Sequence, residues 1–480
     1  MFESRLIIDG VAGPAPGGRT YEHRDPSTGS LVTRAAACTP EDARKAANAA
    51  AAAFPIWSQM SAADRAAVLR RAAILLDERK AQICEIAAEE VGSSPDWTLF
   101  NIEVARDILE EAANAAPYAD EAIPATSKPD CEYRLTRRPA GVVLGIAPWN
   151  AAVTLSVRAV AVPLACGNTV ILKASELCPK THESIALALN DAGLPPGALN
   201  FITNAPDDAE AVVEALIGHP AVRRVNFTGS TRVGREIAVV AARHLKPCLL
   251  ELSGKAAMIV LKDADLDEAA RAAAFSAFFN LGQICMSTDR VIVEESVADA
   301  FTEKLLEQTR ALTDGPGRNR LGKLISQDAA QRIRAMIDDA VAKGAHLLIG
   351  GDVFDDMMHP AVLDGVSSAM RVYSEEVFGP VVGLIRVSDA EEAVTVANDS
   401  IFGLVTSVFS HNYDCASTLA RRLETGICHI NGATVRDDPS MPFGGVKASG
   451  YGRFGGRFAV HEFTEIQWVS IQHSKPDYPI

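Results

Sequence analysis

A single cysteine stands in a stretch of the sequence that could do chemistry. In 281-LGQICMSTDR-290, Cys285 lies between Ile284 and Met286, just before a run with the composition of a strand. A cysteine with apolar neighbours is most often a small buried hydrophobe, and that interpretation has to be weighed first. The alternative is a nucleophile, because a thiolate attacks carbonyl carbon well even when only a small fraction of the thiol is ionised.

The other cysteines suggest no competing chemistry. The chain contains nine cysteines, and no two of them form a Cys-x-x-Cys pair or a metal-ligand spacing with histidines. We therefore predict no metal site. An odd number of cysteines, with no targeting peptide evident at the start of the sequence, indicates reduced thiols and a cytoplasmic protein.

One stretch has the pattern of an anion-binding turn. In 225-VNFTGSTRVG-234 a β-rich run ends and a helical run begins, so Gly229 and Ser230 fall at a helix N-terminus. Backbone N–H groups and the helix dipole favour a phosphate there, and glycine lets the backbone approach it closely. The ordinary alternative is a helix N-cap, which Ser and Thr fill in many proteins.

A second stretch, 170-VILKASE-176, could hold a ribose at the carboxyl end of a strand, where open parallel sheets bind ligands. Lys173 could donate to ribose or phosphate oxygens, and Glu176 could accept from both hydroxyls of a ribose. A carboxylate there repels the extra phosphate of NADP, so Glu176 favours NAD. The alternative for this pair is a solvated surface ion pair.

The glycine spacing of 450-GYGRFG-455 matches the dinucleotide-binding fingerprint, but its predicted structural context does not. That fingerprint has meaning as the turn between a strand and a helix in a βαβ unit, and no strand is predicted before this one. We therefore expect this glycine-rich loop not to bind the dinucleotide.

The elements that must position these residues alternate between strand and helix. The first third of the chain has a helical pattern, including one run from a Ser61–Asp64 cap through residue 90. Short apolar runs then alternate with helical stretches, which predicts a parallel sheet with covering helices. A second alternation follows Glu251, so we predict an α/β fold with two parallel-sheet domains. Two strand-like segments belong to neither set and are predicted to pair with each other or with another subunit: 132–138 and 465–472.

Composition bounds the possible partners. The chain has 480 residues, of which 48% are hydrophobic and 22% charged, and its net charge is -15. These values predict a large soluble globular protein of two or three domains. An acidic chain lacks the basic surface that nucleic acid and anionic membranes require, so we expect neither as a partner. The most apolar region, 151–172, is interrupted by Arg158, Pro163 and Gly167, so no membrane span is predicted.

Several of these stretches together resemble the NAD(P)-dependent aldehyde dehydrogenase family, over nearly the whole chain. The similarity rests on seven motifs in the family's order and at similar spacing: 147-APWN-150, 172-LKASE-176, 227-FTGSTRVG-234, 251-ELSGK-255, 282-GQIC-285, 375-EEVFGP-380 and 442-PFGGVKASGYGR-453. The resemblance implies a coenzyme domain (1–117 and 139–250), a catalytic domain (251–453) and an oligomerisation element (118–138 and 454–480). A homodimer or homotetramer is the assembly that the family implies.

The resemblance also implies roles for three residues. Cys285 corresponds to the nucleophile that adds to the aldehyde, because the tetrahedral adduct releases hydride far more readily than the free aldehyde does. Glu251 corresponds to the general base that activates water against the resulting thioester. Asn150 corresponds to the oxyanion donor, acting with the backbone N–H of Cys285.

The coenzyme that the resemblance implies is NAD. The residues implied in its binding are Ile146, Pro148, Trp149, Lys173, Glu176, Gly229, Ser230, Leu252, Glu376 and Phe378. Ser253 departs from the family, which usually has glycine in that place. Serine would be strained if this position required a positive φ.

The substrate is predicted to be an aromatic aldehyde. The segments around Cys285 and residues 426–456 are most similar to the bacterial salicylaldehyde, vanillin and benzaldehyde dehydrogenases. A ring-sized pocket can be assembled from helical spacing and from neighbours of the thiol. Its predicted lining is Trp97, Phe100, Asn101, Arg158, Ile284, Met286, Arg436 and Phe443.

Two arginines leave the substrate open. Arg158, which would share a helical face with Asn150 and Thr154, could hydrogen-bond a ring hydroxyl or a carboxylate, or could form a structural ion pair. Arg436 stands where the most similar relatives are expected to have histidine, which keeps a more acidic substrate such as a semialdehyde possible. An aliphatic aldehyde also stays open as a substrate.

Other classes of function also remain open at this point. They are a binding scaffold without activity, a cysteine hydrolase or acyltransferase with His429 as its base, and a dehydrogenase that transfers its acyl group to coenzyme A. The joint presence of Cys285, Glu251 and Asn150 argues against the first, and Glu251 favours water over coenzyme A.

Overall fold

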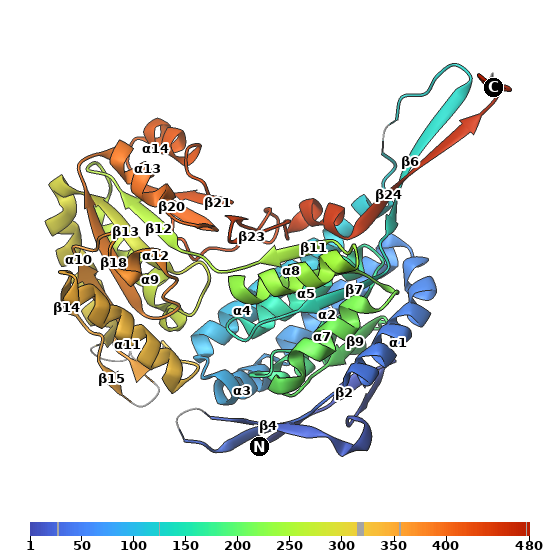
Figure 1. Cartoon of the computed structure of the whole chain (residues 1–480), viewed down its shortest axis with the longest axis horizontal. Helices are drawn as coiled ribbons and strands as arrows, with labels where there is room; N and C mark the ends of the chain where they lie inside the picture. Colours follow the sequence, from blue (N-terminus) through green and yellow to red (C-terminus); the bar gives the residue numbers. More distant parts are fainter. Residues whose placement is uncertain (26–27, 124, 314–320, 355–356, 477) are drawn as a thin grey trace.

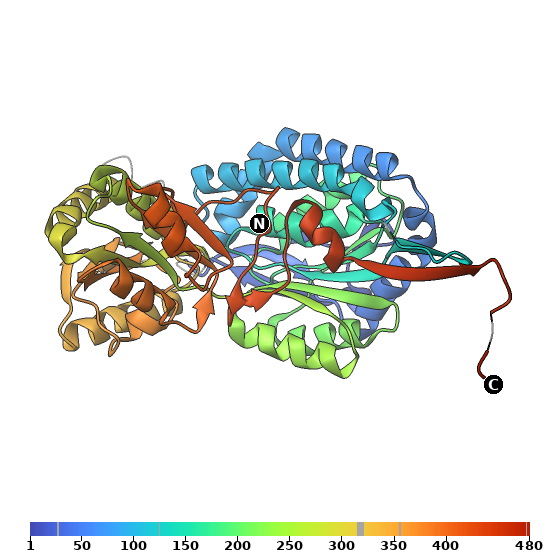
Figure 2. The same cartoon turned by 90° about the horizontal axis from the view of Figure 1, so that it is seen from above.

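The sequence forms two sheets that lie side by side, and a two-stranded arm projects away from them (Figures 1 and 2). The computed structural model describes residues 1–480 except 26–27, 124, 314–320, 355–356 and 477. In the described chain, no helix combines the length and apolar character needed to cross a bilayer.

The first sheet has eight strands in the order β23-β11-β10-β7-β8-β9-β2-β3. Their bounds are Gly450–Tyr451, Cys248–Glu251, Val222–Thr228, Val142–Ile146, Thr169–Lys173, Leu199–Ile202, Leu6–Ile8 and Val11–Gly13. The strands from β11 to β9 are parallel, as the alternation predicts, while β23, β2 and β3 add antiparallel edges. Such a sheet gathers the carboxyl ends of its parallel strands along one edge.

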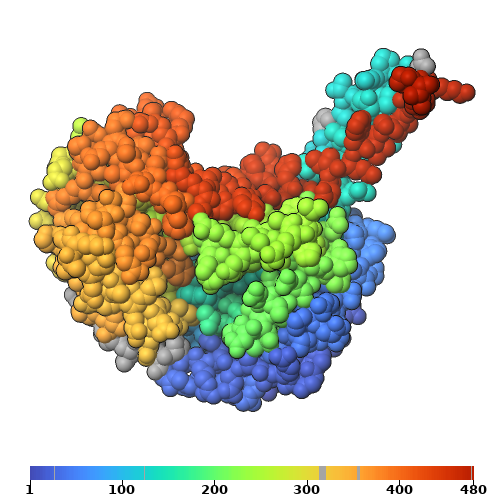
Figure 3. Space-filling view, in the orientation of Figure 1, coloured from blue at the N-terminus to red at the C-terminus, as the bar shows by residue number. Residues whose placement is uncertain are grey.

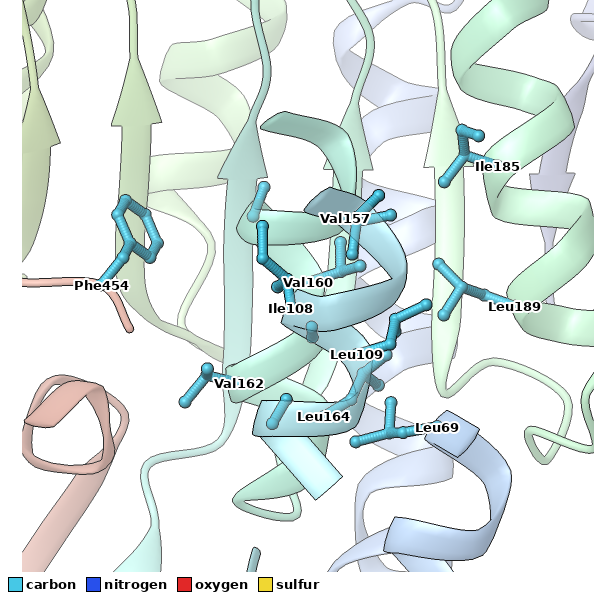
Figure 4. Packing of buried hydrophobic residues seen from close by; sticks show 14 of the residues in the cluster. Leu69, Ile108, Leu109, Val157, Val160, Val162, Leu164, Ile185, Leu189 and Phe454 are labelled. Atoms are coloured by element: carbon cyan, nitrogen blue, oxygen red, sulfur yellow. The ribbon is translucent and has the colours of Figure 1, made fainter. Parts of the chain in front are cut away.

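Helices cover both faces of this sheet because its central strands are apolar on both sides. Leu144 and Ile146 of β7 pack with one cluster that includes residues of α1, α7 and α8, and Val143 packs with the other, beneath α2, α4, α5 and α6. Figure 4 shows the second cluster, where Val157 and Val160 of α5 meet Leu109 of α4. The helices are α1 (Pro40–Ser58), α2 (Ala62–Glu78), α3 (Lys80–Val91), α4 (Pro95–Asp120), α5 (Ala152–Ala165), α6 (Pro179–Asp191), α7 (Ala209–Gly218) and α8 (Thr231–Arg243).

The second sheet has seven strands in the order β14-β17-β18-β13-β12-β20-β21. Their bounds are His346–Ile349, Ala361–Asp364, Val381–Val387, Thr288–Glu294, Ala256–Val260, Val405–Phe409 and Ile427–Ile430. All neighbours are parallel except β14 and β17. The accompanying helices are α9 (Leu266–Phe278), α10 (Glu295–Thr313), α11 (Gln327–Ala342), α12 (Arg371–Ser374), α13 (Ala390–Asn398) and α14 (Tyr413–Ala420).

The remaining elements include the projecting arm. Strands β6 (Cys131–Pro139) and β24 (Thr464–Gln472) pair antiparallel with each other, which confirms the prediction for the two unassigned segments. The other elements are β1 (Phe2–Ser4), β4 (Thr20–Arg24), β5 (Leu31–Ala36), β15 (Val353–Phe354), β16 (Met357–Met358), β19 (Phe402–Gly403), β22 (Val446–Lys447), η1 (Pro16–Gly18), η2 (Pro206–Asp208), η3 (Phe279–Gly282) and η5 (Gly456–Glu462).

Three sequence-based predictions need correction. Residues 1–36 contain five short strands rather than helix, because runs of three to six residues carry too little periodicity to indicate a strand. The helical run from Ala62 to residue 91 is two helices that meet at Arg79, whose φ and ψ are -96° and 3°. Strand β23 falls inside the predicted catalytic range 251–453, yet it pairs with β11 of the first sheet. The loop 450–455 is therefore no βαβ turn, as expected.

Candidate active site

The loop that carries Cys285 has a backbone that few residues adopt. After α9, Asn280 and Leu281 both have φ of 51°, and Gly282 has φ of 69°. A Cβ atom on Gly282 would lie 2.2 Å from the carbonyl oxygen of Gly379. Glycine is therefore required at this turn, both for its φ and for the close approach of the 379 segment.

The loop around Cys285 is held in place by two other segments of the chain. The Gln283 side chain donates to the carbonyl of Lys323 at 2.8 Å and accepts from the N–H of Ile325 at 2.9 Å. A Cβ atom on Gly254 would lie 2.4 Å from the carbonyl oxygen of Cys285. The segment that follows Glu251 therefore packs directly against the backbone of the thiol, and Cys285 keeps partial exposure.

The thiol is neutral at rest. Burial raises the pKa of Cys285 to about 12, and the nearby carboxyls of Glu251 and Glu376 act in the same direction. Because the thiolate is the nucleophilic form, the Cys285 thiol has to give up its proton as it attacks the aldehyde carbon.

Glu251 ends β11 as an isolated, buried carboxyl group. Its residue is 3% exposed, and neither side-chain oxygen has a hydrogen-bond partner among the described residues. Burial raises the pKa of Glu251 to about 8, although Arg158 and Arg453 act to lower it. A carboxyl group that is unsatisfied and titrates near neutral pH fits a general base that awaits a water molecule.

Asn150 lies directly before α5, which begins at Ala152 as the predicted face of Asn150, Thr154 and Arg158 requires. One side-chain N–H of Asn150 donates to the carbonyl of Gln283 at 3.0 Å. A primary amide has two N–H groups, so a second donor remains for a ligand. The backbone carbonyl of Asn150 accepts from the Trp97 indole at 2.8 Å, which fixes this loop against α4.

These three residues line one cavity of about 370 Å³. The same cavity is lined by the predicted coenzyme residues Pro148, Trp149, Gly229, Ser230, Leu252, Glu376 and Phe378, and by the predicted substrate residues Arg158 and Phe443. Sequence reasoning missed Leu155, Thr228, Ser253, Gln283, Ile325, Ala329 and Arg332. Gln283 adjoins the thiol and could have been found. Arg332, Ala329 and Ile325 come from a distant segment at α11, and no local signal connects them to Cys285.

Among the described residues, the lining of this cavity does not include the other predicted substrate residues. Trp97 stacks on Phe100 with ring centroids 5.7 Å apart, and both rings meet Phe279 edge to face. The carbonyl of Asn101 accepts from Thr154 at 3.0 Å, which joins α4 to α5. The Trp97 indole therefore supports the Asn150 loop and both rings pack on Phe279 of η3, while the Asn101 side-chain amide donates to the Trp97 carbonyl within α4.

Three more predicted residues also lie outside that lining. Ile284 and Met286 are buried at 4% and 8% exposure and belong to the core cluster. Arg436 lines a neighbouring cavity of about 330 Å³ with Cys428 and His429, and Phe443 lines both this cavity and that of Cys285. His429 is not among the described residues that line the Cys285 cavity, so the cysteine hydrolase interpretation lacks its histidine base there.

Arg158 forms the ion pair that was one of its two predicted alternatives. Its guanidinium binds the Asp437 carboxylate, and each side chain is 6% exposed. The guanidinium carbon also lies 4.3 Å from the centre of the Phe443 ring, in a cation–π contact. Arg158 and Phe443 still line the Cys285 cavity, so the paired guanidinium borders the reacting groups.

A larger cleft of about 910 Å³ opens beside the cavity, at the carboxyl ends of β7, β8 and β10. The recess is visible among the teal and green surfaces in Figure 3. Pro148, Trp149, Gly229 and Ser230 line both hollows, so the two communicate. Three of the predicted coenzyme residues line the cleft but not the Cys285 cavity: Ile146, Lys173 and Glu176.

The cleft contains groups that suit a dinucleotide. Ser230 caps α8 by accepting from the N–H of Val233 at 3.3 Å, so the helix N-terminus faces the cleft where an anion would be stabilised. Lys173 forms an ion pair with Glu176, which also accepts from Asn204 at 2.9 Å. Burial acts to raise the pKa of Glu176, but the charge and hydrogen bond of Lys173 outweigh it and the pKa is lowered.

Glu376 and Phe378 border the cavity on the side of the second sheet. A Glu376 oxygen accepts from the N–H of Gly254 at 2.9 Å, and Phe378 has φ of 46° and meets the Trp149 ring edge to face. Ser253 is absent from the positive-φ residues of the described chain, so serine is unstrained there. Within the described ranges, no cluster of three or more His, Cys, Asp or Glu side chains could hold a metal ion.

Comparison with known proteins agrees with this geometry. The model of the aldehyde dehydrogenase family matches residues 14–469. Vanillin dehydrogenase of Pseudomonas fluorescens is 51% identical over 483 positions, with 100% of both chains covered. The crystal structure of a salicylaldehyde dehydrogenase from Pseudomonas putida G7, complexed with salicylaldehyde, has a TM-score of 0.97 and 40% identity over 100% of both chains. An NAD-dependent aldehyde dehydrogenase from Sinorhizobium meliloti has a TM-score of 0.94 and 34% identity, covering 99% of this chain and 96% of its own. The chain belongs to the aldehyde dehydrogenase family.

Proposed function

We propose that this protein oxidises an aromatic aldehyde of the hydroxy- or methoxybenzaldehyde type to the carboxylic acid, with NAD as coenzyme. The observation that carries the proposal is one cavity that joins Cys285, Asn150 and the unsatisfied carboxyl of Glu251 and opens into a dinucleotide-sized cleft. The balanced reaction converts aldehyde, water and NAD to acid, NADH and a proton.

The residues divide the chemistry between two steps. The Cys285 thiol gives its proton to solvent as Sγ bonds to the aldehyde carbon and the carbonyl electrons move to oxygen. The free N–H of Asn150 and the Cys285 backbone N–H hold that oxyanion. Bound NAD supplies the hydride acceptor. Glu251 then takes a proton from water as the water attacks the thioester, which releases the acid and restores the thiol.

The aromatic substrate is supported by the relatives and by the far end of the cavity. Relatives named for vanillin and salicylaldehyde match this chain over 100% of its length. Phe443 and Arg158 give an aromatic face and a hydrogen-bond donor at the cavity, which suit a substituted ring.

NAD is favoured over NADP by the acidic lining of the cleft. Glu176, Asp207, Glu210, Glu214 and Glu236 contribute carboxylates, against the cations of Lys173 and Arg232. Lys173 is already paired with Glu176, so a 2′-phosphate would meet a net negative surface. Lys173 and Glu176 would hold the adenosine ribose, and Glu376 and Phe378 would hold the nicotinamide ribose and ring.

We further propose a homodimer or homotetramer assembled through the arm, in the cytoplasm. Strand β24 exposes Ile466 and Trp468 at 56% and 66%, and a two-stranded ribbon gains little stability alone. Sedimentation equilibrium would check the assembly, and a monomer at micromolar concentration would contradict it.

All nine cysteines are free thiols, which suits a reducing compartment.

A panel of aldehydes tests the function. NADH formation would be followed with benzaldehyde, its hydroxy and methoxy derivatives, short aliphatic aldehydes and succinic semialdehyde. We expect the highest kcat/KM with the substituted benzaldehydes, and acid as the product without added coenzyme A. A preference for aliphatic or carboxylate-bearing aldehydes would overturn the aromatic assignment, and no NADH with any aldehyde would overturn the reaction.

A further inference from the structure

The loop from Thr434 to Asp437 is fastened to the thiol loop. The Thr434 hydroxyl donates to the carbonyl of Met286 at 2.7 Å, one residue after Cys285. The N–H of Val435 donates to the Ser276 hydroxyl at 3.4 Å, at the end of α9. Asp437 lies two residues after Val435, so these contacts restrict its position relative to the reacting sulfur.

Asp437 is a buried carboxylate with one oxygen satisfied and one unsatisfied. Oδ2 accepts from Arg158, while Oδ1 is buried and has no hydrogen-bond partner in the part of the chain that the structure describes. Buried polar atoms nearly always have a partner, because an unsatisfied one loses the hydrogen bonds that water would have made with it. An exogenous O–H group at Oδ1 would remove that cost.

The space beside the pair matches a hydroxyl group. Arg158, Asp437 and Phe443 line a further, much smaller cavity of about 10 Å³. This volume is close to that needed for one water-sized group. Arg158 and Phe443 also line the Cys285 cavity, so the small cavity lies directly behind the wall that a substrate ring would contact.

The two charges also act on the reacting groups in opposite directions. Burial is the largest influence on the pKa of Glu251 and of Cys285, and in both cases Arg158 lowers the pKa while Asp437 raises it. Asp437 therefore offsets the field of Arg158 inside the cavity. A lone buried guanidinium would attract a substrate carboxylate, and a neutralised one would not.

We propose that Asp437 is a specificity-determining residue, which together with Arg158 forms a hydroxyl clamp. The ring O–H donates to Asp437 Oδ1, and the ring oxygen accepts from the Arg158 guanidinium. Because the clamp is neutral overall, it admits a phenol and rejects a ring or chain carboxylate. This inference rests on the proposed oxidation of substituted benzaldehydes and assigns the residue that selects among them.

The test compares matched substrates in three enzymes. The substrates are 2-, 3- and 4-hydroxybenzaldehyde, the methyl ether of each, and 3- and 4-carboxybenzaldehyde. The enzymes are the parent, Asp437→Asn, which keeps an acceptor oxygen without the charge, and Asp437→Ala, which loses both. Asp414→Asn removes an exposed carboxylate on α14, which lines neither the small cavity nor the Cys285 cavity, and serves as the control.

For at least one ring position, the parent should prefer the phenol over its methyl ether by about tenfold or more in kcat/KM. Asp437→Ala should bring that ratio close to one, and Asp437→Asn should lower it less. Both variants should gain about tenfold or more on a carboxybenzaldehyde, since Arg158 loses its counter-charge. A gain of activity cannot arise from poor folding. Asp414→Asn should change each ratio by less than about twofold.

The outcomes separate the two proposals. If the parent oxidises no benzaldehyde, the proposed function fails. If it oxidises them without preferring any phenol over its ether, the small cavity holds a water and the clamp is wrong, whatever the variants do. If the preference exists but survives in Asp437→Ala, and carboxybenzaldehydes gain nothing in either variant, the selection resides elsewhere.

Discussion

Two glutamates of this enzyme, one in the larger cleft and one in the Cys285 cavity, have pKa values shifted in opposite directions. Glu176 is buried in part, yet Lys173 and Asn204 bind its carboxylate, and its pKa is lowered. Glu251 is buried without an ion pair or a side-chain hydrogen bond in the described chain, and its pKa rises to about 8 although Arg158, Arg453 and the Gly445 backbone act to lower it. Burial acts in the same direction on both residues, so the directly paired cation at Glu176 accounts for the difference.

This difference corresponds to two kinds of work. A group that recognises a fixed ligand benefits from a permanent charge, which Lys173 maintains on Glu176. A group that must take up and release a proton in each turnover benefits from a pKa near the working pH. The predictions below test whether the two regions are separable in this way.

Replacing the sulfur should have the largest effect. Cys285→Ala removes the covalent step, so aldehyde oxidation should fall by at least about ten-thousandfold. NAD binding, followed by quenching of tryptophan fluorescence, should change by less than about twofold because the cleft is lined by other residues. Substantial residual turnover would remove Cys285 from the mechanism.

Neutralising the base should impair the second step alone. Glu251→Gln keeps the shape of the side chain, so steady-state turnover should fall about a hundredfold or more while one equivalent of NADH still forms in a burst. Rapid mixing would detect the burst, and mass spectrometry would detect the acyl group on Cys285. If both are missing, Glu251 acts before the thioester forms.

The raised pKa of Glu251 predicts a pH dependence. Steady-state turnover, where hydrolysis limits it, should rise about tenfold between pH 7 and pH 9, as a group with a pKa of about 8 loses its proton. Folding holds this proton and unfolding releases it, so the protein loses stability as pH rises from the unfolded pKa to about 8. Glu251→Gln should therefore raise Tm more at pH 9 than at pH 5. The same variant should also lose the rise in turnover between pH 7 and pH 9. An equal Tm difference at both pH values would contradict the assigned pKa.

Changing the cleft carboxylate should have the smallest effect. Glu176→Ser removes one charge and the ribose acceptor, so the ratio of kcat/KM for NAD over NADP should shrink by about tenfold. The rate of acyl hydrolysis should stay unchanged, because Glu251 controls that step. An unchanged coenzyme ratio would mean that the other carboxylates of the cleft determine the preference.

Much of the fold could be predicted because its central strands are apolar runs that alternate with helices. The parallel strands from β7 to β11 follow the predicted alternation, and β6 pairs with β24 as expected. The strands of residues 1–36 escaped because three of them have only three residues, and the other two mix apolar and polar side chains. The antiparallel pairing of β23 with β11 joins positions about 200 apart in the chain, which local patterns cannot indicate.

The site was predictable where chemistry requires particular residue types. Cys285, Glu251 and Asn150 stand in motifs that can be identified in the sequence, and the structure brings all three to one cavity. The pocket walls were harder, because a helical face predicted from spacing does not reveal which neighbour it meets. Trp97 and Asn101 share a face as predicted, but that face packs behind the Asn150 loop. Asp437 had no signal at all, since its partner Arg158 lies 279 positions away.

The contact between Gly254 and the Cys285 carbonyl has a consequence for protein engineering. Two backbones meet there with no room for a side chain, and Gly282 meets the Gly379 carbonyl in the same way. Randomising these positions would yield mostly inactive clones, because any new side chain displaces the sulfur rather than reshaping the pocket. Libraries for new substrates should instead vary the wall formed by Leu155, Arg158 and Phe443, together with Asp437 behind it, where side chains alone define the space.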